Sequence, residues 1–181
     1  VINEFSAANY DQTDFLSGAG TNYADWIELY NAGATSVNIG GYFLSDNLTN
    51  PQKWQIPAGT SIAAGARLVF LADGDDTFAN GYHHTNFKLT QTKGTEHIVF
   101  SNASGTVLES IALNYPNKKN ESRARLTDGS ANWSIQETPT PGAANNTNKE
   151  RYCLKPTFSI APGFYAATQT LTLSNTEPTS S

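Results

Sequence analysis

The densest group of side chains that could do chemistry is an acidic turn, Asp73-Gly74-Asp75-Asp76, which follows an apolar run over residues 67–72. Carboxylates two positions apart in a turn could offer oxygen ligands to Ca²⁺, which takes about six to eight of them. The spacing of an EF-hand loop is absent, because its twelfth position would be His84 instead of a glutamate. A solvated turn is the favoured interpretation, and a Ca²⁺ site formed by Asp73, Asp75 and Asp76 is the alternative.

Two neighbouring histidines, His83 and His84, do not strengthen the metal interpretation. Adjacent side chains on a strand point to opposite faces of the sheet, so the two imidazoles could not easily bind one ion. We therefore predict no cofactor, with Ca²⁺ as the alternative.

Aromatic side chains could form a surface on which sugar rings stack, since a flat ring offers apolar area at a low entropy cost. Trp54, Tyr82 and Tyr115 are the candidate ligand-binding residues. Trp54 is the best of them, because it lies in the strand-like segment 53–56. The favoured interpretation of Trp54, however, is that it packs over the edge of a β-sandwich. Trp133 is expected to fill the sandwich near residues 128–129.

Two glutamates in early strand-like segments, Glu4 and Glu28, could act as paired acids. Solvation on an edge strand explains them more simply. The sequence contains neither a Gly-x-Ser-x-Gly elbow nor a phosphate-binding loop. We therefore predict no catalytic residues and no enzymatic activity.

The composition narrows the classes of partner. The chain has 181 residues, of which 38% are hydrophobic and 15% charged, with a net charge of −5. No basic stripe is present to release counterions from a phosphate backbone, which argues against nucleic acid. No run of about 18 apolar residues is present to span a membrane.

The cysteine and methionine content bears on metal binding and on the location of the protein. Cys153 is the single cysteine, which excludes an internal disulfide framework and a cysteine-based zinc site. The sequence has no methionine, as expected of a processed chain whose signal peptide has been removed. We expect a secreted, periplasmic or cell-surface location.

Short β-rich runs separated by turn residues recur along the chain, and no helical period is sustained. Residues 25–31 alternate, with Ile27 and Leu29 on one face and Trp26 on the other. The apolar run 67–72 is expected to be a buried central strand. About six or seven strands within the first 145 residues predict an all-β fold with two packed sheets.

The chain changes character after Glu137. Thr138-Pro139-Thr140-Pro141-Gly142 cannot extend a sheet interior, because proline donates no ladder hydrogen bond. We predict a sandwich over residues 1–145, a linker over 146–155, and a partial second β module over 156–181. The last segment is too short for a core of its own, so this short β-rich C-terminal extension should pair with the sandwich or with a second copy.

An ordered set of motifs resembles the lamin-tail domain family, and most closely its bacterial secreted branch. These motifs are Ile2-Asn3-Glu4, Asp25-Trp26-Ile27-Glu28-Leu29-Tyr30-Asn31, Gly41-Tyr42-x-Leu44-Ser45-Asp46, Trp54-x-Ile56-Pro57-x-Gly59, Ala72-Asp73-Gly74, Asn86-Phe87-x-Leu89 and Thr138-Pro139-Thr140-Pro141-Gly142-Ala143-Ala144-Asn145. The resemblance implies an immunoglobulin-like β-sandwich without a catalytic centre. No heptads are present, so a filament-forming role does not carry over.

The tail resembles a second family. Pro156-Thr157-Phe158-Ser159, Gly163-Phe164-Tyr165 and Thr170-Leu171-Thr172-Leu173 are similar to the start of the small β module at the C-terminus of chitobiases. Together the two resemblances imply a non-catalytic interaction or spacer module of a larger exported bacterial protein. The alternative is a carbohydrate-binding module accessory to an exported hydrolase. The expected partners are other protein domains or surface glycans.

Overall fold

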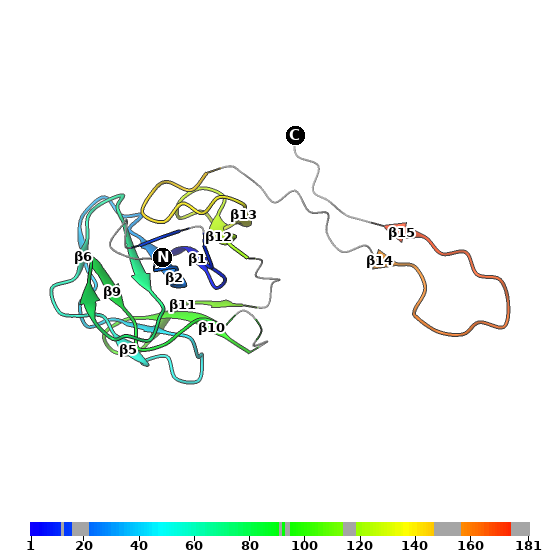
Figure 1. The fold of residues 1–181 in the computed structure, drawn as a ribbon, viewed down its shortest axis with the longest axis horizontal. Coiled ribbons are helices and arrows are strands. Elements are labelled where there is room, and N and C mark those ends of the chain that lie inside the picture. Colours follow the sequence, from blue (N-terminus) through cyan, green and yellow to red (C-terminus); the bar gives the residue numbers. More distant parts are fainter. Residues whose placement is uncertain are drawn as a thin grey trace. The chain divides into compact units, whose positions relative to one another are not determined.

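The computed structural model describes residues 1–11, 13–15, 22–90, 92, 95–113, 119–146 and 157–174. The described chain is all-β, as predicted (Figure 1). Its strands are β1 (Ile2–Ser6), β2 (Trp26–Tyr30), β3 (Val37–Asn38), β4 (Phe43–Ser45), β5 (Trp54–Gln55), β6 (Ser61–Ile62), β7 (Arg67–Leu71), β8 (Phe78–Ala79), β9 (Tyr82–His84), β10 (His97–Ser101), β11 (Val107–Ala112), β12 (Ser122–Arg125), β13 (Trp133–Gln136), β14 (Thr157–Phe158) and β15 (Leu173–Ser174).

A seven-stranded sheet forms one layer, in the order β13-β12-β1-β2-β7-β9-β8. β1 pairs antiparallel with β2 and β12, and β2 pairs antiparallel with β7. β9 lies parallel to β7 on the far side of that strand. The run over residues 67–72 therefore contains an interior strand of this sheet, which confirms the prediction of a buried central strand.

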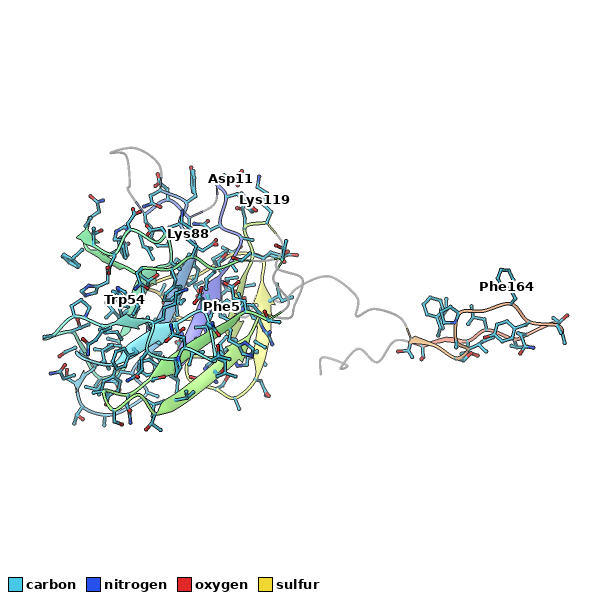
Figure 2. The ribbon with its side chains drawn as sticks, turned by 90° about the horizontal axis from the view of Figure 1, so that it is seen from below. Phe5, Asp11, Trp54, Lys88, Lys119 and Phe164 are labelled. Atoms are coloured by element: carbon cyan, nitrogen blue, oxygen red, sulfur yellow. The ribbon has the colours of Figure 1, made fainter. Side chains whose placement is uncertain are left out.

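A four-stranded sheet, in the order β11-β10-β4-β5, forms the second layer (Figure 1). One apolar core joins the two layers: Phe5, Ile27 and Phe70 from the first sheet belong to the same cluster as Leu44 and Ile98 from the second. Phe5 lies in the interior of this sandwich in Figure 2. Alternation supplies these residues, because every second side chain of a strand points to the same face.

The other face of the large sheet is partly covered as well. Trp26 is fully buried there, in a small cluster with Phe15, Ala24, Val69 and Leu71. The side chains of residues 25–31 alternate between the two faces of the sheet, as predicted, but protein covers both faces around β2. This second cluster orders the chain just before β2, where a pocket opens.

The chain divides into two compact units, Val1–Lys149 and Glu150–Ser181. In the second unit β14 and β15 pair antiparallel. The large apolar side chains of the tail, including Phe164, are exposed there (Figure 2). The finer boundaries at residues 145 and 155 and the pairing of the tail with another surface stay predictions. Across the described ranges, the structure contains no helix long and apolar enough to cross a membrane.

Candidate functional site

The predicted acidic turn does gather potential metal-binding groups, but not the three predicted. Ligand atoms of Asp73, Asp75 and His84 all lie within 4.8 Å of one another. The parallel pairing of β7 with β9 sets His84 opposite Leu71, directly beside the turn. The imidazole of His84 is buried, and its Nδ1 lies 2.7 Å from Oδ2 of Asp73. This contact is a hydrogen bond that fastens the turn to β9.

Asp76 does not join this group. Its Oδ1 accepts a hydrogen bond of 2.8 Å from the indole Nε1 of Trp54. The backbone of Asp76 has a positive φ of 52°, which turns the chain at this residue. The proposed grouping of Asp73, Asp75 and Asp76 is therefore wrong in its third member, because the side chain of Asp76 is committed to Trp54.

The predicted aromatic surface is not formed around Trp54. Only 5% of Trp54 is exposed, and its ring packs edge-on against Phe70, with centroids 5.9 Å apart. The burial agrees with the favoured interpretation, that Trp54 packs on the sandwich, and the alternative of an exposed ring at Trp54 is wrong, because the indole belongs to the core cluster. Tyr82 is half-buried, and its ring packs against Phe15. Tyr115 lies outside the described residues.

Glu4 and Glu28 are fully buried on β1 and β2, which are interior strands of the large sheet. Edge-strand solvation is therefore the wrong explanation for both residues. Glu4 accepts hydrogen bonds from the Thr140 amide at 2.9 Å and the Thr140 hydroxyl at 2.7 Å, and from the hydroxyl of Ser122. Glu28 accepts from the amide of Gly142 at 2.7 Å. The two carboxylates thus hold the proline-rich segment over residues 138–142.

A wider polar network surrounds Glu28. The amide of Asn3 donates to both Glu28 and Asp128 at 2.8 Å, and Arg67 forms an ion pair with Asp128. Burial raises the pKa of Glu28 to about 7 and also raises that of Glu4. Burial acts on Asp128 too, yet the hydrogen bond from Arg67 leaves the pKa of Asp128 lowered. The ionised form is therefore favoured for Asp128 and disfavoured for Glu4 and Glu28.

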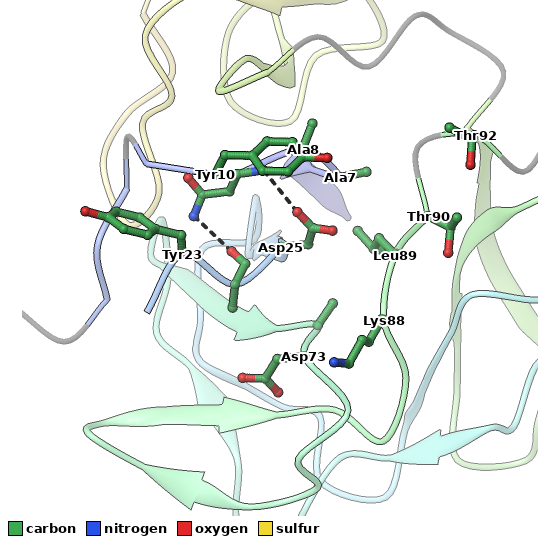
Figure 3. A pocket seen from close by; sticks show the side chains of 13 residues that line it. Ala7, Ala8, Tyr10, Tyr23, Asp25, Asp73, Lys88, Leu89, Thr90 and Thr92 are labelled. Carbon is green, nitrogen blue, oxygen red and sulfur yellow. Dashed lines mark hydrogen bonds between the residues drawn. The ribbon is translucent and has the colours of Figure 1, made fainter. Parts of the chain in front are cut away.

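A pocket of about 420 Å³ opens where the chain leaves β1 and enters β2. Its lining includes Tyr10, Tyr23, Asp25, Asp73 and Lys88 (Figure 3). The amide of Asn9 donates a hydrogen bond of 3.0 Å to Oδ1 of Asp25, and the side-chain amide of Asn9 binds Ala24 O at the same distance. These bonds fix Asp25 at the pocket wall.

Sequence analysis did not single out this pocket as a site. Asp25 was noted only as the first residue of the Trp26 strand motif. The sequence offered no signal for Asp25, because neighbouring residues of an extended segment point to opposite faces and the burial of Trp26 says nothing about the side chain before it. The hydrogen-bond partner of Asp25, the Asn9 amide, comes from the turn after β1, whose path the sequence pattern does not specify.

Comparison with known families supports the assignment of the sandwich. A family model described as Lamin Tail Domain matches residues 1–114. Comparison with curated proteins gave no match, and comparison with solved structures gave none either. The compact unit continues past the matched region, because β12 and β13 complete the large sheet and residues 138–142 contact Glu4 and Glu28.

Proposed function

Because the chain belongs to the lamin tail domain family, we propose that it works as a non-catalytic interaction or spacer module of a larger secreted or cell-surface bacterial protein. The lamin tail domain is an immunoglobulin-like domain, and its family is generally non-catalytic. The role in a larger protein and the exported location go beyond the family assignment and are part of the proposal.

The role of Glu4 and Glu28 is the observation that carries the proposal. These residues are the pair that could have served as acid and base, and both carboxylates accept hydrogen bonds from the segment over residues 138–142. Their donors are backbone amides and a hydroxyl, which bind the chain to itself. Two acids engaged in this way support a structural role for the motif.

The sequence supports the exported, bacterial part of the proposal. The motifs resemble those of the bacterial secreted branch of the family, and the tail resembles the start of a chitobiase-type β module. The low fraction of charged residues, 15%, fits a surface made of neutral polar side chains.

A panel of esters, phosphate esters and glycosides tests the absence of catalysis. We expect no turnover above background by the full 181-residue chain. Turnover that a single substitution in this chain removes, without loss of the fold, would overturn the proposal. A preparation carrying Asp25→Asn separates activity in the pocket from activity elsewhere.

The alternative function, a carbohydrate-binding module, now has to rest on residues other than Trp54. Five large apolar side chains of the tail are exposed, and three of them are aromatic rings in the chitobiase-like motifs, Phe158, Phe164 and Tyr165. Retention on insoluble chitin, cellulose or mucin tests this alternative. Binding that Tyr165→Ala abolishes, while the sandwich stays folded, would favour it over an interaction with protein.

A further inference from the structure

Asp25 is a carboxylate that the fold draws out of water without a counter-charge. Among the described residues it forms one hydrogen bond, from the amide of Asn9, and no ion pair. Burial raises the pKa of Asp25 to about 7, and repulsion from Glu96 acts in the same direction. An ionised carboxylate in this position gains from any cation that enters the pocket.

The other charged groups around the pocket leave it short of positive charge. Asp73 lines the wall, and its carboxylate is engaged by His84. Lys88 is exposed, and its ammonium forms no ion pair with any residue that the structure describes. Among the described residues that line the pocket, two carry carboxylates, Asp25 and Asp73, and one carries an ammonium, Lys88.

The shape of the pocket suits a long side chain. Its volume is about 420 Å³, and alanine and leucine side chains supply its apolar lining, including Ala7, Ala8 and Leu89. An aliphatic stem can lie along such a surface while its charged end reaches a polar group. Tyr10 and Tyr23 add aromatic rings, which attract cations at their faces (Figure 3).

We propose that this pocket binds a lysine or arginine side chain of a partner protein, with the carboxylate of Asp25 as its counter-charge. The inference rests on the proposed interaction function and names the chemistry of the partner. A neutral glycan could hydrogen-bond to the same walls, but it would leave the charge of Asp25 uncompensated.

An NMR titration of the ¹⁵N-labelled full chain tests the proposal. The probe is Nα-acetyl-lysine methylamide, and the matched control probe is Nα-acetyl-norleucine methylamide, which has a similar aliphatic stem without the ammonium. We expect the lysine probe to shift the amide signals of Asn9 and Ala24. The norleucine probe should bind at least about tenfold more weakly, since its stem has no charge to pair with Asp25.

Two variants and the pH dependence sharpen the test. Asp25→Asn keeps an oxygen that can accept from Asn9, so the fold should persist while lysine affinity falls at least about tenfold. Lys88→Gln removes the competing ammonium and should raise the affinity. In the wild type, affinity should rise up to about tenfold from pH 6 to pH 8 as Asp25 ionises. Asp75→Asn, an exposed acid outside the pocket lining, should change little.

Several results would overturn the proposal: equal binding of both probes, lysine affinity unchanged by Asp25→Asn in a folded protein, or no shift with the lysine probe. Shifts of the same signals by N-acetylglucosamine oligomers, but not by lysine, would assign the pocket to a glycan instead. These failures leave the absence of turnover unaffected, so they are distinguishable from failure of the proposed function.

Discussion

The carboxylate of Glu4 in β1 accepts hydrogen bonds from both the amide and the hydroxyl of Thr140, which lies 136 positions later in the chain. Glu28 in β2 binds Gly142 in the same segment. The proline-rich segment is therefore part of the sandwich and completes the hydrogen bonding of two buried acids. It is not merely the start of a linker.

Removal of this segment should destabilise the sandwich. A chain ending after Glu137 would leave Glu4 and Glu28 buried without the donors of Thr140 and Gly142. We expect its free energy of unfolding to fall by about 3 kcal/mol or more, since a buried charge that loses its partner is costly. Urea denaturation measures the loss. A chain ending after Asn146 is the control, and equal stability of the two would contradict the role given to the segment.

Proteolysis should separate the two units. The side chains of Asn145 and Asn146 still bind the sandwich, at Arg125 O and Thr138 O. We expect trypsin to cut first at Lys149 or Arg151 and to leave a stable N-terminal product. Mass spectrometry identifies the cut. Protection of both sites, with a single joint unfolding transition, would show that the tail and the sandwich form one domain.

Stability should decrease as the pH rises through the range in which the buried acids ionise. The pKa values of Asp25 and Glu28 are raised to about 7, whereas those of unfolded carboxyls are about 4. Between these values the folded chain binds more protons than the unfolded chain, so a lower pH favours folding. We expect the free energy of unfolding to be about 5 kcal/mol lower at pH 8 than at pH 5, since each of the two carboxyls loses about 1.4 kcal/mol per pH unit over the roughly two units between pH 5 and its folded pKa.

Asp25→Asn should flatten this pH dependence, because it removes one of the buried carboxyls whose pKa is raised. Asp75→Asn, on an exposed side chain, is the matched control and should leave the curve unchanged. Chemical denaturation at a series of pH values measures both. A free energy of unfolding that does not fall between pH 5 and pH 8 would show that these carboxyls titrate normally in the folded chain.

Calcium should not stabilise the protein. Asp76 binds Trp54 and Asp73 binds His84, so only Asp75 of the acidic turn keeps a carboxylate without a side-chain partner among the described residues. Ca²⁺ requires about six to eight oxygen ligands. We expect no change in the unfolding temperature at millimolar Ca²⁺. Stabilisation that Asp73→Asn abolishes would reinstate a calcium site here.

The strands could be predicted because alternation of apolar residues is a local property. We could assign strands to residues 67–72 and 25–31 from their own sequence, without knowing which strands pair with β7 and β2. The burial of Glu4 and Glu28 could not be predicted in this way. It depends on hydrogen-bond donors at Thr140 and Gly142, which lie far along the chain and which the fold places beside the two carboxylates.

The candidate site was predictable only in part, for the same reason. Asp73 and Asp75 are neighbours in sequence, and their proximity followed directly. His84 joins them through the parallel pairing of β7 with β9, whereas Asp76 is taken by Trp54, 22 positions earlier. Both outcomes depend on the tertiary arrangement of strands, which residue spacing does not encode.

A matched pair of substitutions distinguishes a structural from a chemical role for the two acids. Glu28 accepts from the side-chain amide of Asn3 and from the backbone amide of Gly142. The N–H of Gly142 cannot accept, and Asn3 could turn its oxygen toward Glu28 only by losing its hydrogen bond from the Gly129 amide. In Glu28→Gln the new side-chain NH₂ group therefore faces an N–H donor, and neither group finds an acceptor there. Glu4→Gln is milder, because the hydroxyl of Thr140 can reverse and accept from the new amide.

The most direct measurement combines urea unfolding with turnover on the same preparations of wild type, Glu4→Gln and Glu28→Gln. We expect Glu28→Gln to lose about 1–3 kcal/mol of stability, Glu4→Gln to lose less, and none of the three to turn over an ester, phosphate ester or glycoside. Turnover by the wild type that Glu28→Gln abolishes, with its unfolding curve unchanged, would show that Glu28 has a chemical and not a structural role.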